Sequence, residues 1–165
     1  LPDVALGPPH GKGHGAASAD VVSLGVGGEI IVGFSGRQVL DGPGPDLVVF
    51  ENPFWVGMNP TTPWAELGEV SVSADGESWH TFPCNTQETD PGQWPGCAGW
   101  QPTLDYDVTL AVPLWPPMVG GDPFDLADLG LDAIQYVRIR DLSEEGVSPS
   151  AGFDLDAVGV VHISD

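Results

Sequence analysis

Residues 69–82 read EVSVSADGESWHTF, and this stretch indicates the fold more clearly than any other. Residues 69–73 alternate polar and apolar side chains, which is the pattern of a strand with one buried face. The pair Asp75-Gly76 then predicts a type I′ turn, because Asp-Gly accepts the positive φ angles that this turn requires. Residues 78–82 return as a second strand. The stretch therefore predicts a β-hairpin.

Further strand-like stretches lie on both sides of this hairpin, separated by turns rich in Gly and Pro. Residues 21–24 and 29–34 predict a second hairpin across Gly27-Gly28. The apolar, β-branched run at 47–51 predicts a central strand that is buried on both faces. Other expected elements are strands at 108–112, 136–140 and 157–163, and a short helical turn within 124–131 that begins near Asp122 or Asp125.

About eight strands are expected in all, and this number predicts an all-β fold, a β-sandwich of the jelly-roll type. The 23 Gly and 17 Pro residues agree with it, because both residue types weaken helix interiors. A chain of 165 residues can form one domain with its own core but is short for two. We therefore expect a single β-sandwich domain over residues 1–165, with an irregular lead-in at 1–20 and a long loop region at 84–118.

The charge balance is strongly acidic, with 24 Asp and Glu against 4 Lys and Arg and a formal net charge of −20. Nucleic acid is excluded as a partner, because phosphate binding requires clustered Lys and Arg. An anionic membrane surface is disfavoured for the same reason. Solubility through self-repulsion accounts for many of the carboxylates. Hard oxygen ligands in turns also suit Ca²⁺, so both interpretations stay open.

Acidic residues concentrate in turns that also contain Gly or Pro. No EF-hand spacing is present, so a calcium site would have to combine ligands from separate loops. In the competing interpretation, these Asp residues cap turns and short helices through their own backbone. Near the last strand, Arg138 and Arg140 are alternative partners for the acids. The candidate calcium ligands are Asp41, Asp46, Glu51, Asp122, Asp125, Asp154 and Asp156.

The chain has two cysteines, Cys84 and Cys97, and no Cys-x-x-Cys pair. We expect a disulfide between them, which would stabilise the fold by roughly 3 kcal/mol through restriction of the unfolded chain. A disulfide favours an oxidising compartment, so a secreted or cell-surface location is expected. The sequence contains no signal peptide or transmembrane segment, and membrane insertion is not expected.

Five of the six tryptophans fall in irregular segments of the sequence. Tryptophans in loops either pin those loops to the sandwich or expose a platform on which a sugar ring stacks. The candidate platform residues are Trp55, Trp64, Trp94 and Trp100. The sequence has no GxSxG, P-loop or HExxH motif, so no enzymatic activity is expected. A glycoside hydrolase remains a third alternative, because the separation of a carboxylate pair is a property of the folded chain.

Six stretches of the sequence resemble a recurring domain of bacterial secreted and cell-surface proteins. They are ALGPP (5–9), VVSLGVGGEIIVGF (21–34), DGPGPDLVVFEN (41–52), VSVSADGESW (71–79), GGDPFDLADLGL (120–131) and GFDLDAVGVV (152–161). That domain is similar to galactose-binding-like (discoidin-like) jelly rolls and to carbohydrate-binding modules. In those modules a final-strand motif similar to FDLDAV supplies an Asp to a structural calcium. The resemblance implies that role for Asp156.

The resulting hypothesis is a calcium-binding, non-catalytic extracellular module whose partner is a glycan. Its rival is a structural or adhesive domain of the cell surface, or an assembly subunit, that binds other surface proteins or copies of itself and takes no small ligand. Both hypotheses fit a β-sandwich with acidic turns and loop tryptophans.

Overall fold

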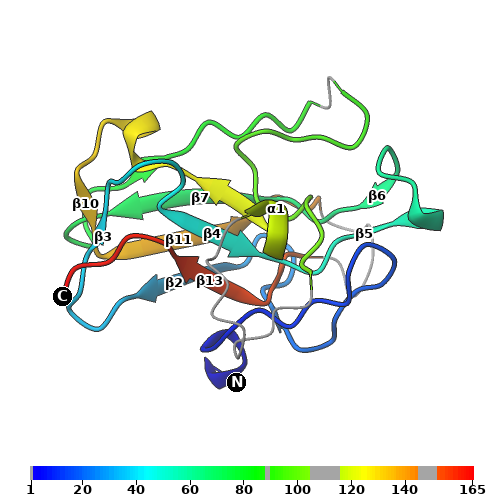
Figure 1. The fold of residues 1–165 in the computed structure, drawn as a ribbon, viewed down its shortest axis with the longest axis horizontal. Coiled ribbons are helices and arrows are strands. Elements are labelled where there is room, and N and C mark those ends of the chain that lie inside the picture. The colour runs from blue at the N-terminus through cyan, green and yellow to red at the C-terminus, as the bar shows by residue number, and fades with distance from the viewer. Residues whose placement is uncertain (1, 88–89, 105–115, 145–151) are drawn as a thin grey trace.

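A computed structural model describes residues 2–87, 90–104, 116–144 and 152–165 (Figure 1). These residues form a nearly all-β structure of several sheets, so the prediction of an all-β sandwich is confirmed. The described part of the chain contains 13 strands rather than about eight, because many of them are only two residues long.

The larger sheet has the strand order β2-β11-β7-β8, and all its pairs are antiparallel. In β11, Val137 and Ile139 are fully buried, while Arg138 between them is half-buried and Arg140 is exposed. Their neighbours across the ladder are Val72 and Val70, so one face of the sheet is continuously apolar. The strands are β2 (Glu29–Gly33), β11 (Tyr136–Asp141), β7 (Gly68–Ser73) and β8 (His80–Thr81).

The second sheet has the order β13-β4-β9, formed by Ala157–Val160, Leu47–Phe50 and Asp122–Phe124. All four residues of β4 are fully buried, which confirms the prediction of a central strand covered on both faces. Leu47 and Val49 join the core between the two sheets, together with side chains of β7 and β11. Phe50 and Val48 point the other way, into a smaller apolar cluster with Val119 and Ala157.

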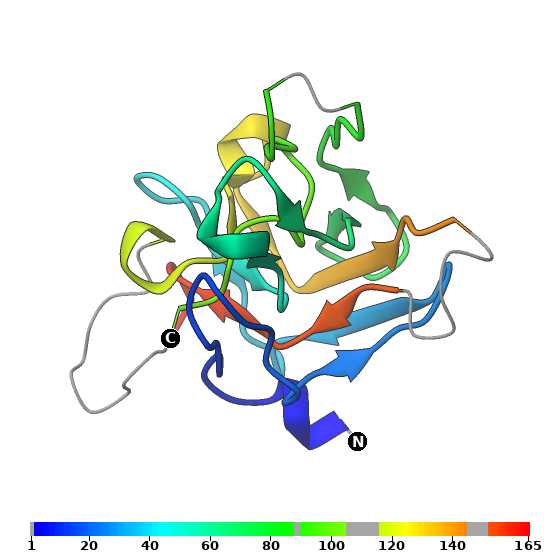
Figure 2. The ribbon, with the colours of Figure 1, turned by 90° about the vertical axis from the view of Figure 1, so that its right-hand side faces the viewer.

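Short pairs of strands and helical turns complete the described structure (Figure 2). No helix among the described residues is long and apolar enough to cross a membrane. The pairs are β1 (Val22–Ser23) with β12 (Asp154–Leu155), β3 (Val39–Leu40) with β10 (Ala133–Ile134), and β5 (Phe54–Trp55) with β6 (Pro63–Trp64). The helical segments are η1 (Pro2–Ala5), η2 (Val56–Met58), α1 (Pro116–Val119) and η4 (Leu126–Leu129).

The hairpin predicted from residues 21–24 and 29–34 is wrong. A tight turn does join the two segments, since the Gly28 N–H donates to the Gly25 carbonyl (2.9 Å). The strands then diverge, because β1 pairs with β12 and β2 pairs with β11. Each of the two strands thus pairs with a strand that is distant in the sequence. As a result, β1 lies directly beside the acidic FDLD segment (153–156).

The hairpin predicted around Asp75-Gly76 exists, but its type I′ turn is wrong. Strands β7 and β8 pair through Ser71 with Thr81, and residues 74–79 form a longer loop. Within it the Asp75 Oδ1 atom accepts hydrogen bonds from the N–H groups of Glu77 and Ser78, both at 2.8 Å. Gly76 has a positive φ of 78°, whereas Asp75 does not adopt the positive φ that a type I′ turn requires.

The expected helical turn is confirmed as η4, which begins after Asp125. Asp125 caps it, because its Oδ1 atom accepts a hydrogen bond from the Ala127 N–H (2.9 Å). The predicted strand at 108–112 lies outside the described residues.

Candidate functional site

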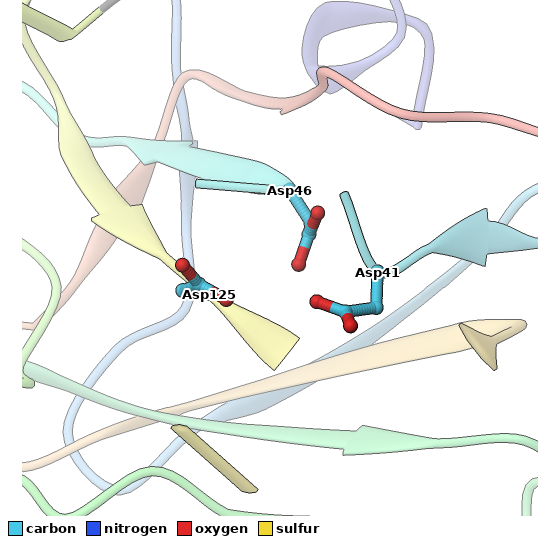
Figure 3. A group of neighbouring side chains, drawn as sticks. All are labelled: Asp41, Asp46 and Asp125. Atoms are coloured by element: carbon cyan, nitrogen blue, oxygen red, sulfur yellow. The ribbon is translucent and has the colours of Figure 1, made fainter. Parts of the chain in front are cut away.

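Three of the predicted ligands, Asp41, Asp46 and Asp125, come together at one edge of the sandwich (Figure 3). Each offers a carboxylate oxygen, and these three oxygens lie within 4.8 Å of one another. We call them the Asp46 group. Asp41 and Asp46 begin and end the turn between β3 and β4, and Asp125 lies between β9 and η4, so two separate turns contribute to it.

Both oxygens of Asp46 and one oxygen of Asp125 already accept hydrogen bonds from the protein. Asp46 is fully buried, and its two oxygens accept hydrogen bonds from the N–H groups of Gly42 and Leu126, both at 2.8 Å. Burial raises the pKa of Asp46, although these two N–H groups act in the opposite direction. The group therefore serves to tie two turns to the start of β4, which is the capping role that Asp commonly has.

A second acidic group consists of Glu51, Glu66 and Asp154, and we call it the Glu51 group. One carboxylate oxygen from each lies within 4.8 Å of the other two. Glu51 follows the central strand β4, Glu66 lies between β6 and β7, and Asp154 begins β12. Glu51 is only 1% exposed, so this group reaches deep into the sandwich.

The Glu51 group accepts few hydrogen bonds for its burial. The Glu51 Oε1 atom accepts from the Asp154 N–H (3.2 Å), and the Glu66 Oε1 atom accepts from the Gly152 N–H (2.8 Å). Asp154 Oδ2 has one long contact with the Asn52 amide (3.4 Å). Asp154 Oδ1 is buried and accepts no hydrogen bond from any residue that the structure describes.

The electrostatic environment of Glu51 is unfavourable for a negative charge. Burial raises its pKa well above the ordinary value, and the carboxylates of Asp154 and Glu66 raise it further. Burial likewise raises the pKa of Glu66. Two unit charges about 4 Å apart repel by roughly 4 kcal/mol at an effective dielectric constant of about 20. Three such carboxylates therefore require a proton or a cation between them when the protein is folded.

The arginines do not supply that cation. Arg138 lies 3.7 Å from Glu29 and also covers the ring of Trp79, while Arg140 lies 3.2 Å from Glu69. Within the described ranges, neither arginine forms an ion pair with Asp154 or Asp156. The salt-bridge alternative for those two acids is therefore wrong, because β11 directs both arginines toward acids on its two neighbouring strands.

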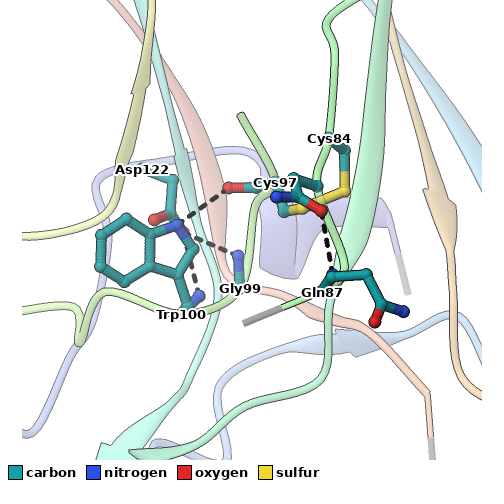
Figure 4. The surroundings of a disulfide bond; sticks show 7 residues. Cys84, Gln87, Cys97, Gly99, Trp100 and Asp122 are labelled. Atoms are coloured by element: carbon teal, nitrogen blue, oxygen red, sulfur yellow. Dashed lines mark hydrogen bonds between the residues drawn. A yellow bond between two sulfur atoms is a disulfide. The ribbon is translucent and has the colours of Figure 1, made fainter. Parts of the chain in front are cut away.

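Asp122 and Asp156 are buried and belong to neither group, although the charge of Asp122 also raises the pKa of Glu51. Both oxygens of Asp156 accept from the His10 N–H, at 2.9 and 3.1 Å, and burial raises its pKa to about 6. Asp122 Oδ2 accepts from the N–H groups of Gly99 (2.7 Å) and Trp100 (3.2 Å), as Figure 4 shows. Burial raises the pKa of Asp122 to about 8 despite those bonds. The calcium-ligand role that the resemblance implies for Asp156 stays a prediction.

The disulfide between Cys84 and Cys97 is present, as predicted (Figure 4). It closes the loop between residues 84 and 97. Directly after this loop, the backbone N–H groups of Gly99 and Trp100 donate to Asp122. The carbonyl of Cys97 also accepts a hydrogen bond from the indole N–H of Trp100 (3.1 Å). The disulfide and Asp122 together fix the position of the Trp100 ring.

Two of the four candidate tryptophans, Trp55 and Trp100, line the same cavity. The cavity has a volume of about 400 Å³, and we call it the tryptophan pocket. Its other lining residues are His14, Pro60, Gly92, Gln93, Gln101, Pro102, Leu104 and Gly120. Trp64 lies elsewhere, 59% exposed on the β5–β6 hairpin and stacked on Phe54, and Trp94 is half-buried and does not line this pocket.

Two acids that the fold places centrally, Glu66 and Asp141, were not among the residues predicted from the sequence. Glu66 belongs to the Glu51 group, but in the sequence it is not part of one of the acidic turns from which the other candidates were chosen. Asp141 ends β11 and accepts from the N–H groups of Gly27, Ser143 and Phe153. Its position in the sequence, after the alternating strand 136–140, was the available signal for a buried carboxylate.

Comparison of the chain with protein-family models, with curated proteins and with solved structures finds no match.

Proposed function

We propose that the chain is a non-catalytic, calcium-binding extracellular module, and that the Glu51 group holds the ion. The observation that carries this proposal is the buried Oδ1 atom of Asp154, which accepts no hydrogen bond among the described residues and lies in a group with a fully buried Glu51. A buried carboxylate oxygen without a donor costs free energy unless a cation occupies the space beside it. Carboxylate oxygens are the ligands that Ca²⁺ prefers.

The same geometry has one alternative explanation, in which a proton neutralises Glu51. The two explanations differ in their pH dependence. Without an ion, the raised pKa of Glu51 makes the folded state most stable below the ordinary carboxyl pKa of about 4, and this stability is lost as the pH rises through the folded pKa. With Ca²⁺ bound, stability increases as the pH rises, because the ion binds the ionised carboxylates.

Thermal unfolding in calcium chloride and in EGTA tests the proposal at neutral pH. A ligand at 100 times its dissociation constant stabilises a protein by roughly 2.7 kcal/mol, which raises the Tm of a chain of this size by about 5–10 °C. We expect this shift for the native protein. Glu51→Gln should abolish the shift and should leave the protein in EGTA at least as stable as the native one, because a neutral amide removes the repulsion.

Glu77→Gln provides the matched control, because Glu77 is exposed in the β7–β8 loop and belongs to neither acidic group. It should retain the full calcium shift. An unchanged Tm in calcium, together with metal-free protein by elemental analysis, would contradict the proposal and favour the proton. If the calcium-induced Tm shift persists in Glu51→Gln, the ion binds somewhere other than the Glu51 group.

The extracellular location and the glycan partner belong to the same proposal. The Cys84–Cys97 disulfide supports an oxidising compartment. A formal net charge of −20 opposes nucleic acid and anionic surfaces as partners. The described side chains that could stack on a sugar ring include Trp55 and Trp100, which share one pocket.

A second candidate function is that of a structural or adhesive surface domain. One observation favours it, namely that the β5–β6 hairpin carries Val56, Met58 and Trp64 with 51–61% of each side chain exposed. This hairpin lies at one end of the molecule in Figure 1. Exposed apolar residues gathered on a protruding element are typical of contacts with other proteins.

A further inference from the structure

The tryptophan pocket differs from the rest of the molecule in its charge. The chain contains 24 acidic residues, yet among the ten described residues that line this pocket none is an Asp, a Glu, a Lys or an Arg. A ligand that carries phosphate, sulfate or carboxylate groups would find no cation here and would be repelled by the net charge of the protein. The lining therefore suits a neutral ligand.

The pocket presents rigid aromatic surfaces. The Trp55 ring stacks on the His14 imidazole, with ring centres 4.1 Å apart and planes 8° from parallel. The backbone supports this pair, because the Trp55 N–H donates to the His14 carbonyl (2.7 Å). Trp100 is held from two sides, by its indole bond to Cys97 and by the bond from its backbone N–H to Asp122. Little side-chain entropy remains to be lost when a ligand binds to these rings.

The two amide side chains of the pocket are uncharged, and each can both donate and accept hydrogen bonds. Gln93 and Gln101 each carry one carbonyl acceptor and one amide with two donor hydrogens, and His14 adds an imidazole. Hydroxyl groups, which also donate and accept, match this set. An apolar ring face bordered by several hydroxyls is the chemistry of a neutral pyranose sugar.

The size of the pocket agrees with a small occupant. Its volume of about 400 Å³ lies near the lower end of the roughly 300–1,000 Å³ range of small-molecule sites. Its walls come from distant parts of the chain, and the Thr103 hydroxyl anchors one wall by donating to the Glu51 carbonyl (2.5 Å). The pocket is thus a pre-formed feature of the sandwich and not a gap beside a single loop.

We propose that the tryptophan pocket binds one neutral pyranose unit of a glycan, stacked against Trp55 or Trp100 and hydrogen-bonded by Gln93 and Gln101. This inference deepens the glycan-binding part of the proposed function and rests on it, but it does not depend on the calcium ion. It assigns no binding role to Trp64 or Trp94.

Isothermal titration with neutral oligosaccharides of glucose, galactose, mannose, xylose and N-acetylglucosamine tests the pocket in the full chain. We expect saturable binding of at least one of them and no binding of an oligogalacturonate or a sulfated glycan. Trp100→Ala and Trp55→Ala should each weaken binding by about tenfold or more, the effect of losing one aromatic stacking partner. Gln101→Ala should weaken it as well, and because Gln101 also contacts the buried Asp122, the Tm of this variant is measured alongside.

Trp64→Ala is the matched control, because it removes an exposed tryptophan outside the pocket, and it should leave the affinity unchanged. The calcium-induced Tm shift of each variant reports separately on folding and on the ion site. Absence of binding for every neutral sugar, or binding that survives Trp55→Ala, Trp100→Ala and Gln101→Ala in folded protein, would overturn the inference. Binding of a proline-rich peptide by the same pocket, with no sugar bound, would overturn it too. If the calcium-induced Tm shift is retained in that case, the proposal of a calcium site in the Glu51 group is unaffected.

Discussion

Asp122 is an acidic residue at a buried position, where an ionised carboxylate is unfavourable. The residue is 2% exposed, and its Oδ1 atom accepts no hydrogen bond from the described part of the chain. Burial raises its pKa to about 8, so the folded protein retains a proton that the unfolded chain releases near pH 4. The acid form therefore contributes to holding Gly99 and Trp100.

This retained proton predicts a pH-dependent stability. Below the ordinary carboxyl pKa of about 4 the residue is protonated in both states, and its contribution is fully present. As the pH rises toward about 8, the unfolded state binds fewer protons, so the free energy of unfolding falls by up to about 1.4 kcal/mol per pH unit. Asp122→Asn should remove this part of the slope. Urea unfolding in chelator across the pH range measures it.

Asp132→Asn is the control for that experiment, because Asp132 is exposed and its side chain belongs to neither acidic group. This variant should retain the native slope. If the free energy of unfolding of Asp122→Asn changes with pH as steeply as that of the native protein, the pKa of Asp122 is not raised.

At the level of elements, the disulfide loop supports one wall of the tryptophan pocket. Cys84 and Cys97 are 13 residues apart, and the segment after Cys97 pairs with β7, because Ala98 and Gly68 exchange backbone hydrogen bonds at 2.9 Å. Phe82 and Ala98 are both buried in the main core, so each end of the loop is attached to the sandwich.

Replacement of both cysteines by serine should destabilise the protein by about 3 kcal/mol, the entropic effect expected for a loop of this length. Urea unfolding of the native and double-serine proteins measures the loss. We expect sugar affinity to fall as well, because Cys97 positions Trp100. A double-serine protein with native stability would mean that the core already fixes the loop without the covalent bond.

The strands whose burial leaves a periodic pattern in the sequence could be predicted. Which strands pair with one another in the sheets could not be predicted. The run Leu47–Phe50 and the alternation in Tyr136–Asp141 identified the two central strands, because a buried face leaves a period in the sequence. The pairing of β1 with β12 joins residues more than 130 positions apart, and no local pattern encodes it. The Asp75 turn was misassigned because a side chain that accepts backbone N–H bonds replaced the expected turn geometry.

For the candidate sites of the whole molecule, the types of residue could likewise be predicted, but their combination could not. Composition identified carboxylates and tryptophans as the relevant residue types, and both occur in the assembled sites. The sequence could not indicate that Glu66 would join Glu51 and Asp154, or that Trp55 would share a pocket with Trp100. Those combinations depend on how distant loops meet at one side of the sandwich, which only the folded chain determines.

Self-association is the property of the whole molecule that separates the two candidate functions. A net charge of −20 opposes contact between copies, so the protein should be monomeric at low ionic strength. If the β5–β6 hairpin is an adhesive surface, light scattering at raised NaCl should show a mass that increases with protein concentration. Met58→Asn should reduce this increase, because it removes an exposed apolar side chain and Asn tolerates the positive φ of 61° at this position.

The uncharged lining of the tryptophan pocket has a consequence for where the protein can work. Dissolved salt screens interactions between charges, with a range of about 8 Å at physiological ionic strength, but it leaves ring stacking and neutral hydrogen bonds almost untouched. A ligand held by stacking on tryptophan and by hydrogen bonds with glutamine amides should therefore bind with nearly the same affinity at low and at high salt. The net charge of −20 keeps the molecules apart in dilute media, while binding in the pocket should depend little on the salt concentration.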